Sequence, residues 1–174
     1  MAEKLFISWE DYNSTVEKLA IKIADSGYKP DVLIGIMRGG APIIDVLSRV
    51  FKLKCAYLAV ESYSGKGIED QQGQLIFSRE MSSTVKDLGG NLLLCDDLSD
   101  TGTTLNRSID WLKKYPPLKG KIKDIKTAIL WKKKQSTFEA DYCAIKLSNN
   151  PWIVQPFEKY EEIRVEDLKK KHQK

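Results

Sequence analysis

The sequence contains little histidine and cysteine: it has one histidine and three cysteines in 174 residues. The histidine, His172, lies in a lysine-rich tail, so an acid or base in a catalytic site would be a carboxylate, lysine or tyrosine. The cysteines are odd in number and widely spaced, which argues against a disulfide framework and against a zinc site. Buried free thiols in a reducing compartment explain them better.

The sequence also has no apolar run long enough to cross a membrane, and its N-terminus lacks the apolar segment of a secretory signal. We therefore expect a cytoplasmic protein without a transmembrane segment. The motif G-x-x-x-x-G-K-[S/T] is absent, which excludes a Walker-type phosphate loop. The formal charge, 28 − 24 = +4, is too small to indicate a nucleic-acid partner, and we expect none.

What the sequence does contain is a regular alternation of helical patterns and short apolar runs. Ser8 is a candidate N-cap and Gly27 a candidate stop for the first helix. Strands covered on both faces read as near-continuous apolar runs, so the alternation predicts an α/β fold with a doubly wound parallel sheet. The predicted strands are 32–37, 55–60, 74–79, 91–95, 126–131 and 142–147, and the predicted helices are 8–27, 41–51 and 103–115. We expect residues 151–157 to be irregular, and 158–174 to begin a short helix and then fray.

The most informative stretch is LLLCDDLSDTGTTL, residues 92–105, where an apolar strand runs into acids and a hydroxyl-rich turn. Gly102 permits a sharp turn, and the unpaired N–H groups at the start of a helix favour a phosphate. Asp96 and Asp97 repel a phosphate, but they can accept hydrogen bonds from a sugar diol or hold a hydrated Mg²⁺. An Asx turn with helix caps would explain one Asp and one Thr, but it would not explain two adjacent acids.

Residues 92–105 resemble the 5-phosphoribosyl-1-diphosphate (PRPP) signature of the type I phosphoribosyltransferases. The likeness extends from Ser8-Trp9 to Pro156-Phe157, and it is to the purine members, the xanthine-guanine and hypoxanthine-guanine enzymes. The resemblance implies a single domain with a core over about 28–135. It also implies a flexible lid loop, a small hood made of the N-terminal segment and about 136–160, and a basic tail over 161–174.

The family pattern assigns roles to individual residues. It implies that Asp100 is the general acid/base beside purine N7 and that Asp97 is nearest the Mg²⁺ cofactor. It also implies that the peptide bond Met37–Arg38 is cis, at the start of a diphosphate-binding loop. The PRPP-binding residues that the resemblance implies are Arg38, Gly39, Asp96, Asp97, Asp100, Thr101, Gly102, Thr103 and Thr104.

Three further residues are implied in binding the purine. Trp152 would stack on the base, and the backbone at Ile153 would meet its edge. Lys132 would donate to a 6-oxo group, which suits an ammonium because it has donors and no acceptor. Two more lysines follow Lys132 directly, and the sequence leaves open which of the three reads the base. Ser62 and Tyr63 match the start of the lid.

The implied reaction transfers the phosphoribosyl group of PRPP to guanine, xanthine or hypoxanthine, which yields a nucleoside monophosphate and diphosphate. The resemblance also implies a homodimer or homotetramer. One alternative is a PRPP-binding regulatory protein of the same fold, and another is an enzyme for orotate, uracil or adenine. A receiver-like phosphoacceptor domain does not fit, because the acids and the lysine that it needs do not occur in the expected order.

Overall fold

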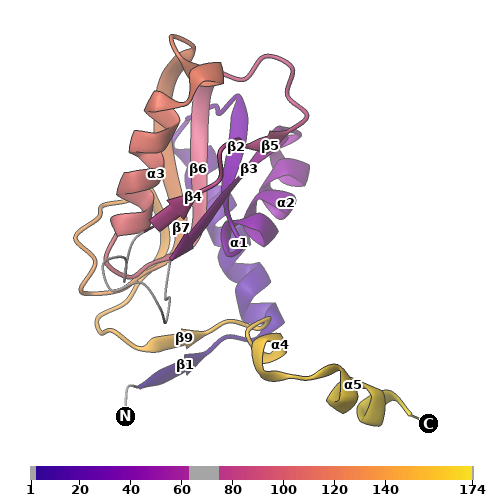
Figure 1. The fold of residues 1–174 in the computed structure, drawn as a ribbon. Helices are drawn as coiled ribbons and strands as arrows, with labels where there is room; N and C mark the ends of the chain where they lie inside the picture. The colour runs from indigo at the N-terminus through magenta and orange to yellow at the C-terminus, as the bar shows by residue number, and fades with distance from the viewer. Residues whose placement is uncertain (1–2, 63–74, 174) are drawn as a thin grey trace, which may run out of the picture.

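The computed structural model describes residues 3–62 and 75–173, and it shows helices on both faces of a mostly parallel sheet (Figure 1). The strands are β1 (Lys4–Phe6), β2 (Val32–Met37), β3 (Lys54–Ser62), β4 (Leu75–Phe77), β5 (Ser82–Ser83), β6 (Gly90–Ser99), β7 (Ile122–Lys132), β8 (Tyr142–Lys146) and β9 (Trp152–Val154). The helices are α1 (Trp9–Asp25), α2 (Gly40–Phe51), α3 (Thr103–Lys114), the 3-10 turn η1 (Pro116–Leu118), α4 (Lys159–Glu162) and α5 (Val165–His172).

Within the described residues, the main sheet has the strand order β4-β3-β2-β6-β7-β8, and β5 pairs with β3. The neighbours from β3 to β8 are parallel, while β4 and β5 run antiparallel to β3. The expected doubly wound α/β sheet is confirmed, with antiparallel strands at one side. Parallel strands place their carboxyl ends at one edge, where such folds bind ligands.

Each central strand contributes to two hydrophobic cores. In β2, Leu33 packs with α1 and α2, whereas the next residue, Ile34, packs with α3 on the opposite face. In β6, Leu93 and Leu94 divide between the two cores in the same way. Successive side chains of a strand point to opposite faces, so burial on both faces explains the continuous apolar runs.

The first helix begins and ends where its sequence pattern predicts. The Ser8 Oγ accepts a hydrogen bond from the Asp11 backbone N–H at 3.0 Å, and Gly27 follows the C-cap Ser26 with a φ of +74°. An N-cap oxygen satisfies one of the free N–H groups at a helix start. The capped helix then packs its buried side chains, such as Leu19 and Ile23, on the sheet.

The two longest strands extend further than the apolar patterns indicate. The prediction of 91–95 is too short for β6, and the prediction of 126–131 is too short for β7. The pairing between them continues as far as Leu98↔Trp131 and Ser99↔Lys132. Asp96 and Asp97 therefore lie inside a strand, in the part that pairs with β7, and do not lie in the turn that follows it.

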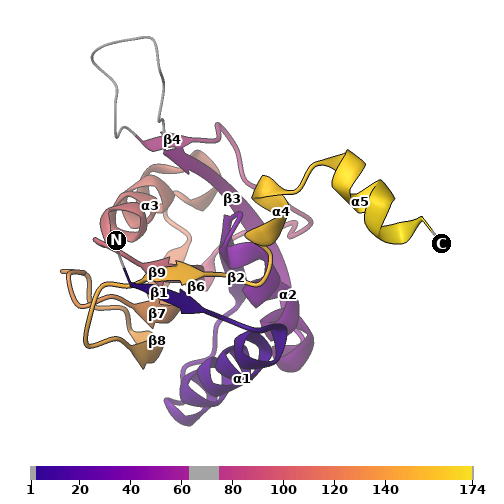
Figure 2. The same cartoon turned by 90° about the horizontal axis from the view of Figure 1, so that it is seen from below.

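The prediction that residues 151–157 are irregular is wrong in part, because Trp152–Val154 forms β9. This strand pairs in parallel with β1, near the other end of the chain. The Trp152 N–H donates to the Glu3 carbonyl at 2.7 Å, and the Ile7 N–H donates to the Val154 carbonyl at 3.0 Å. Both views place this small sheet beyond the carboxyl ends of the main strands (Figures 1 and 2).

Residues 158–174 begin with a short helix, α4, as expected, but the prediction that the rest frays is wrong, because it forms a second helix, α5. Helix α5 has no buried residue and projects from the body of the protein (Figure 2). None of the helices in residues 3–62 and 75–173 combines the length and the apolarity that crossing a bilayer requires. Cys95 and Cys143 are buried and Cys55 is half-buried, and all three are free thiols, as expected.

Candidate active site

The ends of β2 and β6 bring the Arg38-Gly39 turn against the acidic pair. The peptide bond Met37–Arg38 is cis, as the resemblance implied. A Cβ atom on Gly39 would lie 2.4 Å from the Asp97 Cγ, so a larger residue does not fit between the turn and the carboxylate. Arg38, Gly39 and Asp97 line one cavity of about 780 Å³.

Of the two adjacent carboxylates, Asp96 is buried and Asp97 is half-buried at the edge of the cavity. The Asp96 Oδ1 accepts from the Asp97 N–H at 3.0 Å, and the Asp97 Oδ1 accepts from the Leu98 N–H at 2.8 Å. Burial raises the pKa of both carboxyls, and the charge of Asp97 raises the pKa of Asp96 further. Such a pair is suited to a ligand that supplies hydroxyl donors or a cation.

The turn after β6 forms a cradle of hydroxyl and N–H groups at the start of α3. Gly102, the N-cap, has a φ of +92°, which favours glycine. The Oγ1 atoms of Thr101 and Thr103 lie 2.9 Å apart, and the Thr103 N–H donates to the Thr101 Oγ1 at 3.3 Å. Residues 96–105 line a cavity of about 200 Å³ here. Free N–H groups and the helix dipole favour an anion at this position.

Asp100 lies between the cradle and the segment that follows β7. Its Oδ1 is 3.2 Å from the Lys133 Nζ and also accepts a hydrogen bond from the Gln135 Nε2. Backbone hydrogen bonds from Lys133 to Ser99 and from Thr137 to Thr101 hold the two segments together. Within the described part of the chain, no hydrogen bond reaches the Asp100 Oδ2, which leaves that oxygen available to a ligand.

Two of the expected base-binding residues come from β9. Trp152 is 58% exposed and lines the 780 Å³ cavity, so one face of its indole ring is open to a planar ligand. Ile153 is 3% exposed and points into the core, so only its backbone can face a ligand. Trp152 thus offers its side chain to a ligand and Ile153 only its backbone, and their roles in binding a purine stay predictions.

The neighbouring lysines point to different places. The Lys132 Nζ pairs with Glu139, and the structure does not bring Lys132 together with Trp152 or Asp100. The Lys133 Nζ lies 6.0 Å from the centroid of the Trp152 ring and 3.2 Å from the Asp100 Oδ1. The structure thus joins Lys133, and not Lys132, to the other candidate base-binding groups.

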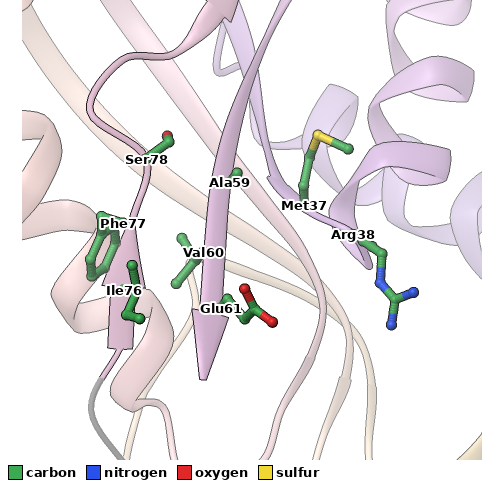
Figure 3. A pocket seen from close by; sticks show the side chains of 8 residues that line it. All are labelled: Met37, Arg38, Ala59, Val60, Glu61, Ile76, Phe77 and Ser78. Carbon is green, nitrogen blue, oxygen red and sulfur yellow. The ribbon is translucent and has the colours of Figure 1, made fainter. Parts of the chain in front are cut away.

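The resemblance places the start of a lid at Ser62 and Tyr63, where β3 ends. The backbone of Ser62 pairs with Leu75 of β4, while Tyr63 and the expected lid loop lie outside the described residues. A second cavity, of about 800 Å³, lies between this hairpin and Arg38, and it is lined by Met37, Glu61, Ile76 and others (Figure 3). The side chains of β3, β4 and the end of β2 surround this space.

Mg²⁺ is usually held by one or two carboxylates together with substrate phosphates and waters. Asp96 and Asp97 fit this mode, because Asp97 faces the cavity beside Arg38 and Gly39. Within residues 3–62 and 75–173, no group of three or more His, Cys, Asp or Glu side chains could hold a metal ion. A Mg²⁺ ion at this site would therefore also use oxygen atoms of the ligand.

A family model of the phosphoribosyl transferase domain matches residues 8–162. The chain belongs to the phosphoribosyltransferase family. It is 30% identical over 152 residues to the hypoxanthine-guanine phosphoribosyltransferase of Aquifex aeolicus, covering 83% of this chain and 80% of the relative. Its structure is similar to the crystal structure of a purine phosphoribosyltransferase from Pyrococcus horikoshii, with a TM-score of 0.70 and a sequence identity of 29%. The match covers 93% of this chain and 97% of that one.

The fold is also that of the Helicobacter pylori xanthine-guanine-hypoxanthine phosphoribosyltransferase. The two are 22% identical, with a TM-score of 0.70, and the match covers 97% of this chain and 99% of that one. The expected family and the expected class of enzyme, a glycosyltransferase of the phosphoribosyltransferase type, are confirmed.

Two residues of this phosphoribosyltransferase site carry no signal that singles them out in the sequence. Gln135 bonds to Asp100, and Gln155 donates from its Nε2 to the Asp97 Oδ2 at 3.2 Å. Gln155 does stand as a polar residue between Val154 and Pro156 in an apolar stretch. That pattern is compatible with many roles, and only the fold shows which carboxylate it meets.

We predict that Gly102→Ala destabilises the protein by about 2–5 kcal/mol. The cost combines a positive φ with a Cβ that would lie 2.2 Å from the Phe138 Cβ. Gly120→Ala is the matched control, because Gly120 also has a positive φ, +73°, but no atom lies within 4 Å of its added Cβ. The control should cost about 1–2 kcal/mol. Urea unfolding measures both, and equal losses would contradict the close packing of this turn on Phe138.

We also predict that Asp96→Asn raises the melting temperature of the ligand-free protein at neutral pH by about 2–4 °C. Burial raises the pKa of Asp96, so stability is lost as the pH rises from the ordinary range of an aspartate towards that raised pKa. The two proteins should therefore converge in acid. Scanning calorimetry at several pH values tests this, with the exposed Asp110→Asn as control. A wild type that is the more stable protein at neutral pH would contradict the prediction.

Proposed function

We propose that this protein transfers the 5-phosphoribosyl group of PRPP to a 6-oxopurine. The observation that carries the proposal is the convergence of three groups beside the phosphate cradle. The Lys133 Nζ lies 3.2 Å from the Asp100 Oδ1 and 6.0 Å from the centroid of the Trp152 ring. A hydrogen-bond donor, a proton acceptor and an aromatic surface are what a 6-oxopurine needs.

PRPP would bind along the carboxyl ends of β2 and β6. The cradle of Thr101, Gly102, Thr103 and Thr104 would hold the 5′-phosphate, because it combines hydroxyl groups with the start of α3. Asp96 and Asp97 would accept hydrogen bonds from the ribose hydroxyls. Arg38 and the Gly39 backbone would hold the diphosphate beside Asp97.

Asp97, and with it Asp96, would hold Mg²⁺ together with oxygen atoms of PRPP. The ion would neutralise charge on the diphosphate as it leaves. This chain's own contribution is to place the Asp97 carboxylate and Arg38 around one cavity before the ligand binds. Preorganised charges of this kind stabilise a transition state without reorganising during the reaction.

The purine would lie against the open face of Trp152, with its edge toward the backbone of Ile153. We assign the donor to the 6-oxo group to Lys133 in place of Lys132, because the Lys132 Nζ is paired with Glu139. Adenine carries a 6-amino group, which would face the Lys133 ammonium donor to donor. A buried polar mismatch of this kind discriminates strongly between ligands.

In the reaction, a purine nitrogen forms the bond to C1 of the ribose as the bond from C1 to the diphosphate oxygen breaks. The purine ring gains positive character and loses a proton. The Asp100 Oδ2 would accept this proton from N7, while Oδ1 stays held by Lys133 and Gln135. Lys133 and Gln135 would thus keep the acceptor oxygen directed at the base.

The remaining expectations complete the proposal. The small sheet of β1 and β9 would act as the hood that presents Trp152, since it lies beyond the ends of the main strands (Figure 2). Ser62 and Tyr63 would begin a lid, whose closure would exclude water from the reacting ribose.

The names of the Aquifex aeolicus and Pyrococcus horikoshii relatives, both purine phosphoribosyltransferases, support the choice of a purine.

The first test is turnover with PRPP and Mg²⁺ across a panel of nucleobases, read as diphosphate release. Hypoxanthine, guanine or xanthine should be consumed much faster than adenine, orotate or uracil. Asp100→Asn should lower kcat by about 10²–10⁴-fold, the usual range for loss of a general base.

Two outcomes would favour the alternatives. If PRPP binds, as measured by calorimetry, and no base in the panel is consumed, the protein would be a PRPP-binding regulator. If adenine, orotate or uracil is preferred, the assignment of the base would be wrong.

The choice between the two lysines gives a separate prediction. Lys133→Met should lower kcat/KM for hypoxanthine by about 10–100-fold relative to adenine, because the donor to the 6-oxo group is lost. Lys132→Met should leave the ratio of the two bases unchanged and reduce only stability, because its buried ammonium pairs with Glu139. Competition assays with both bases measure the ratio, and the reverse pattern would restore the role to Lys132.

A further inference from the structure

Gln155 connects the small sheet to the acidic pair. It directly follows β9 and is 2% exposed, and its Nε2 donates to the Asp97 Oδ2 at 3.2 Å. The strand that carries Trp152 is therefore tied by a side chain to a residue of the central strand. The two residues of this hydrogen bond are 58 positions apart in the sequence.

The orientation of the Gln155 amide follows from its partner. A carboxylate only accepts hydrogen bonds, so the amide must present its NH₂ group to Asp97 and turn its oxygen away. In the described part of the chain, that oxygen, Oε1, is buried and has no hydrogen-bond partner. An unmatched buried acceptor destabilises a fold. Stability alone would favour an apolar side chain here, so the amide calls for an explanation in the site.

The contact determines where the Asp97 carboxylate can point. The Asp97 Oδ1 is held by the adjacent Leu98 N–H at 2.8 Å, a contact within its own strand. Among the described residues, Gln155 is the hydrogen-bond donor that reaches Oδ2, and it comes from the segment directly after β9, a strand of the small sheet. On another side, the carboxylate lies so close to Gly39 that a Cβ there would lie 2.4–2.7 Å from its atoms. Rotation of the carboxylate would break its hydrogen bond with the Leu98 N–H or its hydrogen bond with Gln155.

We propose that Gln155 is a positioning residue, which holds the Asp97 carboxylate in the orientation that receives PRPP and links that orientation to the purine-binding strand. The proposal rests on the proposed function, because it takes Asp97 as a PRPP-binding group. The hydrogen bond from Gln155 would couple the position of β9, which carries Trp152, to the orientation of the Asp97 carboxylate. Movement of β9 would then change the affinity for PRPP as well as the affinity for the base.

The test compares the full-length wild type with Gln155→Met, which keeps the length of the side chain and removes the donor. We expect the KM for PRPP to rise by about 10–100-fold, the range for a hydrogen bond to a charged group, with the KM for the base changed less than about threefold. Tyr12→Phe is the matched control. Its hydroxyl is also buried and unpaired among the described residues, and nearby Asp97 and Asp96 help to raise its pKa.

A double-mutant cycle with Asp97→Ala, which removes both carboxylate oxygens, separates positioning from a general loss of packing. If Gln155 acts through Asp97, Gln155→Met should have no further effect on PRPP binding, measured by calorimetry, in the Asp97→Ala background. Independent, additive effects would overturn the proposal, as would an unchanged KM for PRPP in Gln155→Met. An equal rise of that KM in Tyr12→Phe would also overturn it.

Gln155→Asn, one methylene shorter and still polar, replaces Gln155→Met if the latter does not fold, and the same rise in the KM for PRPP is expected. The failure of the proposed function looks different. In that case the wild type itself would show no PRPP-dependent turnover of a purine. With an active wild type, the cycle decides the role of Gln155 alone.

Discussion

The site depends on one constraint, the burial of Asp96 and the partial burial of Asp97 beside it near the end of the central strand. Asp96 and Asp97 lie in β6, which is paired on one side with β2 and on the other with β7. The strand cannot move them into water without breaking the sheet. Their desolvation disfavours the charged forms in the ligand-free protein. A ligand that supplies hydroxyl groups and a cation would stabilise the charged carboxylates. The ligand-free protein would then have a lower folding stability than it needs to have, and ligand binding would be stronger for it.

Several neighbouring features follow from the position of these carboxylates. The turn at Gly39 approaches Asp97 so closely that a side chain would collide with it. Arg38 brings a positive charge to the same cavity and pairs with Glu161 at 2.7 Å. Both side chains of that pair are largely exposed, so water screens the ion pair, and under the proposed function a diphosphate would replace Glu161 at little cost.

The base side of the site is assembled from segments that are far apart in the chain. Asp100 follows β6, Lys133 follows β7, and Trp152 begins β9. The pairing of β9 with β1 carries Trp152 to the end of the main sheet, and Gln155 links the same segment to Asp97. Trp152, proposed to meet the base, and Asp97, proposed to meet the sugar, are therefore both connected to the segment formed by β9 and Gln155.

The sequence alone determined the sheet, its main helices and the hydroxyl-rich turn at the start of α3, because these depend on local patterns. Apolar runs such as 32–37 record burial on both faces of a strand, and D-T-G-T-T at 100–104 records a turn into a helix. Only the tertiary structure showed the pairing of β1 with β9, since three-residue strands have no periodicity to detect and depend on a distant partner. Only the structure, too, separated Lys132 from Lys133 and joined Gln155 to Asp97. Adjacent residues of one type look the same in a sequence, and the direction of each side chain is decided by contacts with parts of the chain that come together only in the fold.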